Sequence, residues 1–356
     1  MAEAANRQAS IETTAIREAH RFDVKHLEEY CRANVEGFGG EFSVSQFEGG
    51  QSNPTFLLET TGPRGGKRYV MRKKPPGKLL QSAHQVDREY KAMKALAQTD
   101  VPVPHMYALC EDDAVIGTAF YIMECLEGRI LRDPTLPGMT PQERAAIYDE
   151  MNAVLAKLHN VDYKAIGLED FGRPGNYFER QSARWIKQYR DAQTDEVKAM
   201  EALIDWLPQH IPADSSTSIA HGDYRLENTM FHPSEPRMIA VLDWELATIG
   251  HPLADLAYNC MLYHTGTGTT LRDIDFKATG IPTEHDYVAA YCRRTGRDSI
   301  ENWNFYLGFA IFRLASIAQG VYKRGLDGNA SSEKAKTYGD ACRQLAEAAW
   351  GIVQRG

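Results

Sequence analysis

Residues 221–228 read His-Gly-Asp-Tyr-Arg-Leu-Glu-Asn, and the apolar run at 239–242, Ile-Ala-Val-Leu, leads directly into Asp243. Asp223 and Asn228, five residues apart on one loop, can serve two different partners. A carboxylate can orient and deprotonate an acceptor hydroxyl, while amide and carboxylate oxygens are ligands for Mg²⁺. The spacing therefore predicts phosphoryl transfer from a nucleotide, with Asp223 as the catalytic base and Asn228 and Asp243 as metal ligands.

An alternative for this stretch is a tight turn in which Asp and Asn side chains only satisfy backbone donors. The full pattern, H-x-D-x-x-x-x-N followed by an Asp after the next strand, favours the catalytic interpretation. It is the catalytic-loop pattern of kinases, with Gly222 where protein kinases carry Arg.

Residues upstream of the catalytic-loop motif predict the part of the fold that binds the nucleotide. Gly49 and Gly50 lie between two β-like patterns, where backbone amides could approach phosphates, although two glycines between strands also suit a plain hairpin. Strand alternation places Val70 and Arg72 on one face, so that Val70 could contact adenine and Arg72 the phosphates. Because Lys73 follows at once, the phosphate contact is predicted only to within one residue.

Glu89 lies 17 residues after Arg72 on a predicted helix near 83–97. From there it can pair with the cation and fix its direction, as the corresponding ion pair does in kinases. A surface glutamate with a local basic partner is the alternative. The hydrogen-bonding backbone of Met123–Leu126, with Glu124 and Leu126, is expected beside the nucleotide base.

The order of patterns predicts an α+β fold. Residues 1–22 are expected to form a flexible tail, and 23–125 a β-rich lobe with strands near 55–60, 68–72, 106–110 and 120–125. Residues 126–356 are expected to form a large, mainly helical lobe. Its helical patterns lie near 177–207, 252–263, 284–295, 301–324 and 332–353, and a capping box opens a further helix at Thr140-Pro141-Gln142-Glu143.

Composition narrows the class of protein. The 356 residues carry a net charge of −8, from 40 basic and 48 acidic side chains, which argues against nucleic acid and anionic membranes as partners. No run of 18 apolar residues and no apolar N-terminal segment is present, so we expect no membrane span and no signal peptide. The six cysteines are widely spaced, which predicts free thiols in a cytoplasmic protein.

The catalytic-loop motif and the residues before it closely resemble the aminoglycoside phosphotransferase/choline kinase-like family of small-molecule kinases, over residues 25–350. The resemblance implies a protein-kinase-like fold, ATP or GTP as phosphoryl donor and Mg²⁺, as two ions, held by Asn228 and Asp243. It also implies that Asp255, in the stretch 252–257, braces the catalytic loop. Leu158-His159 matches the family's Leu-His at a helix end, and His221 is expected to be a structural residue of the loop.

Three stretches, 70–80, 86–90 and 319–322, more narrowly resemble the kinase-like domain fused to some acyl-CoA dehydrogenases, and its free-standing bacterial relatives. That resemblance implies a hydroxyl of an acyl or acyl-CoA compound as acceptor. Arg72 departs from the usual Lys. The C-terminal helices are expected to form the acceptor pocket, with Tyr224, Trp244 and Tyr263 either near its mouth or in the core.

Several other functions fit less well. No G-x-x-x-x-G-K-[ST] is present, and the Gly266-Thr267-Gly268 stretch lacks the third glycine of a dinucleotide-binding motif. A protein kinase would carry Arg in the catalytic loop and Ala-Pro-Glu after it. An aminoglycoside or choline/homoserine-type kinase, and a nucleotide-binding pseudokinase, remain alternatives. The expected partners are nucleotide and a small hydroxyl compound, with the protein a monomer or homodimer.

Overall fold

The structure is a computed structural model that describes residues 12–48, 53–62, 66–75, 85–266, 270–328, 335 and 337–355. The chain divides into two compact units. The first comprises Met1–Leu131, Tyr163–Leu168 and Leu226–Ala247, and the second comprises Arg132–Asp162, Glu169–Arg225 and Thr248–Gly356. The predicted lobes are continuous segments, whereas each unit is assembled from three segments.

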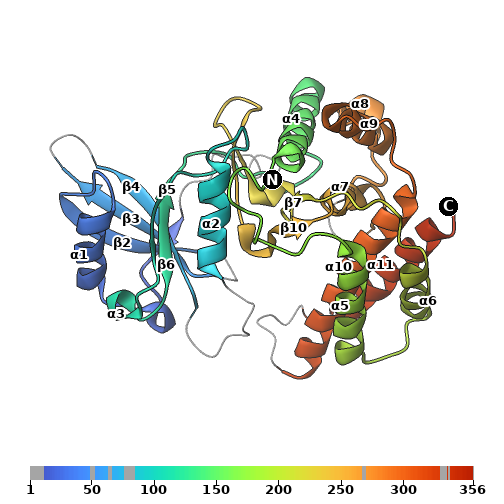
Figure 1. Ribbon diagram of the computed structural model, residues 1–356, viewed down its shortest axis with the longest axis horizontal. Coiled ribbons are helices and arrows are strands. Elements are labelled where there is room, and N and C mark those ends of the chain that lie inside the picture. The colour runs from blue at the N-terminus through green and yellow to red at the C-terminus, as the bar shows by residue number, and fades with distance from the viewer. Residues whose placement is uncertain are drawn as a thin grey trace. The chain divides into compact units, whose positions relative to one another are not determined.

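An antiparallel sheet forms the framework of the first unit, with the strand order β1-β2-β3-β4-β6-β5 (Figure 1). Its strands are β1 (Thr13–Thr14), β2 (Glu41–Phe47), β3 (Thr55–Thr61), β4 (Arg68–Lys73), β5 (Met106–Cys110) and β6 (Phe120–Glu124). The helices of this unit are α1 (Val24–Asn34), α2 (Val86–Leu96) and α3 (Asp113–Ile116). A separate hairpin, β8 (Thr229–Phe231) with β9 (Met238–Val241), completes the unit.

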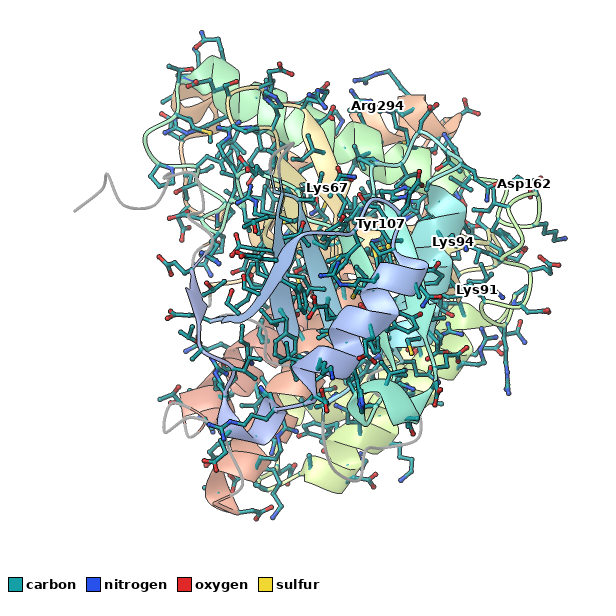
Figure 2. The ribbon with its side chains drawn as sticks, turned by 90° about the vertical axis from the view of Figure 1, so that its left-hand side faces the viewer. Lys67, Lys91, Lys94, Tyr107, Asp162 and Arg294 are labelled. Atoms are coloured by element: carbon teal, nitrogen blue, oxygen red, sulfur yellow. The ribbon has the colours of Figure 1, made fainter. Side chains whose placement is uncertain are left out.

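The two faces of this sheet serve different purposes. One face packs under α1, which lies in front of the strands in Figure 2, and Tyr69 and Met71 of β4 are fully buried there. Asp23 starts α1, because its Oδ1 accepts hydrogen bonds from the backbone N–H groups of Lys25 and His26 at 2.9 and 3.0 Å. Strand alternation turns Val70 and Arg72 of β4 to the other face of the sheet, on which α2 lies.

Helices dominate the second unit. They are α4 (Pro141–Asn160), α5 (Tyr177–Ala192), α6 (Lys198–Trp206), α7 (Pro252–Cys260), α8 (Phe276–Thr279), α9 (Glu284–Thr295), α10 (Trp303–Leu326) and α11 (Tyr338–Val353). Helix α10 packs against α5, α7 and α11. A short ladder pairs β7 (Ser218–Ala220) with β10 (Thr248–Gly250), and the 221–225 segment follows β7 directly.

Helix α10 is, within the described ranges, the one helix long and apolar enough to cross a membrane. In its most apolar 18-residue window, 72% is buried inside the protein. Its composition is therefore accounted for by its place in the core of the second unit.

The predicted α+β fold class is confirmed. The capping box at Thr140 is present, with the Thr140 hydroxyl accepting from Glu143 N and the Glu143 carboxylate accepting from Thr140 N. The helix expected over 177–207 is instead two helices, because Gln193 adopts extended backbone (φ −61°, ψ 132°) and ends α5. The six cysteines are free thiols, as predicted.

Candidate active site

Arg72 is the central cation of the first unit. Its Nη1 lies 2.9 Å from Glu89 Oε2, and its Nη2 lies 2.9 Å from Asp243 Oδ1. Glu245 Oε2 is 3.7 Å away. The side chain is 13% exposed, and its buried Nε has no acceptor among the described residues. The predicted pairing of Arg72 with Glu89 is thus formed, and the same guanidinium also reaches the predicted metal ligand after β9.

Glu89 is fully buried and held from three sides. Asn53 Nδ2 donates to Oε1 at 2.9 Å, and the Tyr121 hydroxyl donates at 3.1 Å to Oε2, the same oxygen that Arg72 contacts. Burial raises the pKa of Glu89 to about 7, and the charge of Arg72 opposes that shift. The Glu89 carboxylate therefore orients Arg72, and because it is fully buried it is not accessible to a ligand.

Lys73, the alternative phosphate contact, lies on the opposite face of β4. Its Nζ is 5.7 Å from the centre of the Phe22 ring, and only 4% of the residue is exposed. Val70, on the Arg72 face as predicted, is 8% exposed. The alternation of β4 is regular, since Tyr69 to Lys73 pair in unbroken register with Glu124 to Phe120 of β6.

Asn228 and Asp243 are brought together by the β8–β9 hairpin. Asn228 immediately precedes β8, Asp243 follows β9, and Leu242 N donates to Asn228 O at 2.8 Å across the hairpin. Asp243 has left-handed backbone, with φ 63°, a conformation in which Asp is tolerated better than most residues. Amide and carboxylate oxygens at one hairpin end suit Mg²⁺, which takes one or two protein carboxylates and completes its shell with phosphates and water. The described residues contain no cluster of three or more His, Cys, Asp or Glu side chains able to hold a metal by themselves.

The remaining nucleotide predictions have mixed outcomes. Gly49 and Gly50 lie outside the described residues. Glu124 ends β6, and its Oε2 accepts from His105 N at 3.3 Å. Both Glu124 and Leu126 are half-buried. Their proposed place beside the base stays a prediction.

The 221–225 segment belongs to the second unit, where Asp255 braces it. Asp255 Oδ2 accepts from His221 N at 2.6 Å, and Oδ1 accepts from Gly222 N at 2.8 Å. His159 Nε2 lies 3.4 Å from the same carboxylate. The predicted bracing contacts are therefore present. Gly222 has a φ of 83°, a left-handed value that a residue with a side chain adopts only with strain, which accounts for glycine at this position.

Asp223 is partly accessible, with 18% of its side chain exposed. The Tyr258 hydroxyl donates to Asp223 Oδ1 at 2.5 Å, and Arg225 Nε lies 3.4 Å from Oδ2. The predicted base is therefore held at one oxygen by a phenol and faces a cation at the other.

An arginine missed in the sequence contacts this loop. Arg313 of α10 donates from Nη2 to Gly222 O at 2.7 Å, and its guanidinium carbon is 5.4 Å from the centres of both the Trp185 and Tyr258 rings. Arg184 of α5 also lies over Trp185, at 5.5 Å. Because Arg313 follows the catalytic motif by about 90 residues, no local pattern links the two.

The three aromatic residues expected either near the acceptor or in the core are core residues. Tyr224 is fully buried and donates to Met151 O at 2.8 Å, and Trp244 is 1% exposed with Nε1 donating to Val241 O at 2.9 Å. Tyr263 is 9% exposed and donates to Pro282 O at 3.0 Å. The core alternative is therefore the right one, and the aromatic side chain that contacts the Asp223 carboxylate is Tyr258.

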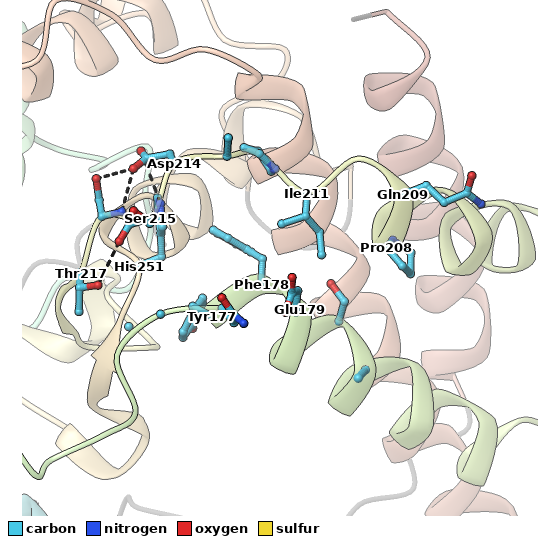
Figure 3. A pocket seen from close by; sticks show the side chains of 18 of the residues that line it. Tyr177, Phe178, Glu179, Pro208, Gln209, Ile211, Asp214, Ser215, Thr217 and His251 are labelled. Atoms are coloured by element: carbon cyan, nitrogen blue, oxygen red, sulfur yellow. Dashed lines mark hydrogen bonds and ion pairs between the residues drawn. The ribbon is translucent and has the colours of Figure 1, made fainter.

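A cavity of about 780 Å³ lies in the second unit beside the start of α5 (Figure 3). Tyr177, Phe178, Ile211, Asp214 and His251 are among its lining residues. None of the predicted site residues is among the described residues that line it. The cavity is therefore separate from the predicted catalytic positions.

Asp214 provides a test of electrostatics in this unit. Burial disfavours its ionised form, but hydrogen bonds from Ser216 and the neighbouring His251 and Arg297 side chains lower the pKa of Asp214 to about 2. The folded carboxylate then stays ionised where the unfolded one is protonated, so its stabilisation is present above about pH 4 and is lost as the pH falls toward 2.

Asp214→Asn is accordingly expected to lower the free energy of unfolding at pH 7 by about 1–2 kcal/mol, a figure reduced because the side chain is 28% exposed. Urea unfolding should show about the same difference at pH 7 and 5 and a smaller one at pH 3. Asp191→Asn, which removes an exposed partner of Lys187, is the control and should change little. A difference that is the same at all three pH values would contradict the assigned role.

Residues 43–291 match the model of the phosphotransferase enzyme family (APH). The chain belongs to this family. Its predicted enzyme class, a phosphotransferase acting on small-molecule hydroxyl groups, is supported by that membership.

Proteins of known structure resemble this chain in fold. A crystal structure of a "putative aminoglycoside phosphotransferase" from Ralstonia eutropha JMP134 is 54% identical, has a TM-score of 0.87, and is matched over 94% of this chain and 99% of that one. Choline kinase from Cryptosporidium parvum, at 15% identity and a TM-score of 0.59 over 93% of this chain and 98% of that one, shares the fold.

Curated relatives are longer proteins. Acyl-CoA dehydrogenase family member 10 of Mus musculus is 46% identical over 96% of this chain and 32% of its own length. Acyl-CoA dehydrogenase family member 11 of Homo sapiens is 44% identical over 94% of this chain and 44% of its own length. The chain thus spans less than half the length of these relatives. This agrees with the predicted resemblance to a kinase-like domain that is fused to some acyl-CoA dehydrogenases.

Proposed function

We propose that the chain transfers the γ-phosphoryl group of ATP or GTP, with Mg²⁺, to a hydroxyl of a small anionic molecule such as a hydroxyacyl compound or its CoA thioester. The observation that carries the proposal is Arg72 bound at 2.9 Å to both Glu89 and Asp243. A cation aimed by a buried carboxylate, beside a second carboxylate at a hairpin end, is the arrangement that phosphoryl transfer requires.

In this proposal the first unit holds the donor. Arg72 contacts the phosphates, and its Nε, buried and without an acceptor among the described residues, is a donor that an anion can use. Asn228 and Asp243 hold the metal, which neutralises phosphate charge when bound. Val70 and the 123–126 segment lie against the base.

Asp223 acts on the acceptor. It accepts the hydroxyl proton as the acceptor oxygen bonds to the γ-phosphorus, while the bond from that phosphorus to the bridging oxygen breaks and the nucleoside diphosphate leaves. Most of the rate would come from positioning and charge neutralisation.

The acceptor class is supported by the cations near Asp223. Arg225 lies 3.4 Å from its carboxylate, Arg313 binds the carbonyl of the preceding residue, and Arg184 shares the Trp185 ring with Arg313. Three arginines favour an acceptor that carries phosphate or carboxylate groups. They disfavour choline and aminoglycosides, which are cations. The cytoplasm is the proposed location.

The deciding experiment measures ADP release with magnesium-ATP against 3-hydroxybutyryl-CoA, 3-hydroxybutyrate, homoserine, choline, a sugar and kanamycin. The expected result is turnover highest with an anionic hydroxyacyl compound. Preference for choline or kanamycin would overturn the acceptor class. Nucleotide binding with no release beyond that of the Asp223→Asn variant would favour the pseudokinase alternative.

Asp243→Ala is expected to abolish most of the gain in ATP affinity that Mg²⁺ provides, because a metal carboxylate is lost beside the phosphates. Nucleotide titrations with and without Mg²⁺ measure this gain, which should fall by about tenfold or more, equivalent to about 1.4 kcal/mol. Glu245→Gln is the matched control, since Glu245 is a carboxylate 3.7 Å from the same arginine but outside the motif. If Asp243→Ala keeps the wild-type magnesium dependence, Asp243 is not a metal ligand.

A further inference from the structure

One face of α7 holds the whole 221–224 segment. Asp255, Tyr258 and Asn259 are spaced i, i+3 and i+4, so their side chains project from the same side of the helix. Asp255 binds the amides of residues 221 and 222, Tyr258 binds the side chain of Asp223, and Asn259 Nδ2 donates to Tyr224 O at 3.2 Å. Four consecutive loop residues are thus held by one helical turn.

Tyr258 is the member of this set that touches the predicted base itself. It is 8% exposed, and burial raises its pKa well above its usual range, so the phenol stays protonated and donates. The guanidinium of Arg313 lies over its ring at 5.4 Å while binding Gly222 O at 2.7 Å. Arg313 of α10 therefore holds the Tyr258 ring in place, and it does so while bound to Gly222, the residue before Asp223.

We propose that Tyr258 and Arg313 are positioning residues of the phosphotransferase, acting through Asp223. Tyr258 occupies Oδ1 and sets the carboxylate plane, so that Oδ2 is the oxygen that accepts the acceptor proton. Arg313 holds both the Tyr258 ring and the Gly222 carbonyl, which fixes the backbone before Asp223. This inference rests on the proposed function, because it assigns Asp223 as the base.

The physical reason is the geometric demand of proton transfer. A carboxylate free to rotate about its side-chain bonds presents Oδ2 to the acceptor only part of the time, and a misplacement of about 1 Å can cost about 100-fold in rate. A short hydrogen bond from a rigid, buried phenol removes that freedom. Nucleotide binding in the first unit uses other residues and should not depend on it.

The test compares Tyr258→Phe with Tyr148→Phe in the full chain. Tyr148 is a buried tyrosine of the same unit whose hydroxyl donates to Pro134 O at 2.6 Å, so its variant loses a similar bond away from Asp223. The probe is ADP release from magnesium-ATP, with 3-hydroxybutyryl-CoA and with water alone as acceptor. We expect Tyr258→Phe to lower kcat by about 10- to 100-fold with KM for ATP within twofold, and Tyr148→Phe to keep kcat within threefold.

A double variant separates positioning from general damage to the fold. If Tyr258 acts only through Asp223, then adding Tyr258→Phe to Asp223→Asn leaves the residual rate unchanged. A further loss of more than threefold, or a kcat of Tyr258→Phe within twofold of wild type, would overturn the inference. Arg313→Lys, which keeps the charge but loses the planar group, should lower kcat without raising KM for ATP.

The outcomes also separate the two proposals. Wild-type protein without Asp223-dependent ADP release would overturn the proposed function and this inference with it. Asp223-dependent release that is insensitive to Tyr258→Phe would overturn the inference alone.

Discussion

Asp223→Asn is expected to lower the rate of phosphoryl transfer by about 10³-fold or more while leaving the affinity for magnesium-ATP within about threefold. The amide keeps the size of the carboxylate but cannot accept the hydroxyl proton. The variant should fold, because the loop backbone is held by Asp255 through the amides of His221 and Gly222 and not by the Asp223 side chain.

Single-turnover transfer from radiolabelled ATP, with nucleotide affinity measured separately, distinguishes the two effects. Arg225→Gln is a useful comparison, since Arg225 lies 3.4 Å from Asp223 yet cannot act as a base. It is expected to raise KM for an anionic acceptor more than it lowers kcat. Turnover of Asp223→Asn near the wild-type rate would show that Asp223 is not the base.

The sequence predicted the fold class because local patterns and tertiary structure agree in this chain. The alternation in 68–72 sends Tyr69 and Met71 into the core under α1 and leaves Val70 and Arg72 on the other face. The capping box at Thr140 starts a helix where it was expected, and Asp23 caps α1. The shortest strands could not be predicted. The two-residue β1 and the three-residue β10 are defined by their partner strands, since neither is long enough to show an alternating pattern.

The candidate site was predictable where its residues form a motif, and unpredictable where they meet only through the fold. His221–Asn228 and Asp243 could be identified from spacing. Tyr258 could not, because in sequence it is one more buried residue of α7. Trp244 lies beside a motif residue, and the sequence left open whether it belongs to the acceptor pocket or the core. Its indole N–H donates to Val241 O within the hairpin, which only the folded structure shows.

Arg72→Met is expected to reduce kcat/KM by an amount equivalent to about 2–4 kcal/mol of transition-state stabilisation, comparable to the loss of one preorganised donor. The guanidinium is the one group seen to contact both Glu89 and Asp243 in the described structure, so its loss removes both the phosphate cation and the link between them. Arg72→Lys should retain partial activity, because a point charge can still neutralise phosphate without the bidentate fork. Glu89→Gln should be milder than Arg72→Met, since it only loosens the direction of the cation.

Removing one partner of a buried ion pair can also unfold a protein, at a cost of about 3–5 kcal/mol. The double variant Arg72→Met/Glu89→Gln controls for this, because it removes the buried charge together with its partner. Its thermal stability should exceed that of Arg72→Met alone, while its activity should remain low. Recovery of activity in the double variant would mean that Arg72 serves stability and not phosphate binding.

Lys73→Met decides between the two cations of β4. Lys73 Nζ lies over the Phe22 ring, on the face away from Glu89, and burial lowers the pKa of this lysine. An apolar side chain of similar length suits that environment, so Lys73→Met should keep kcat/KM within about threefold and should not lower the melting temperature. Steady-state kinetics of the two methionine variants side by side provide the measurement. An inactive Lys73→Met together with a nearly normal Arg72→Met would assign the phosphate contact to Lys73, and would require β4 to shift its register by one residue when nucleotide binds.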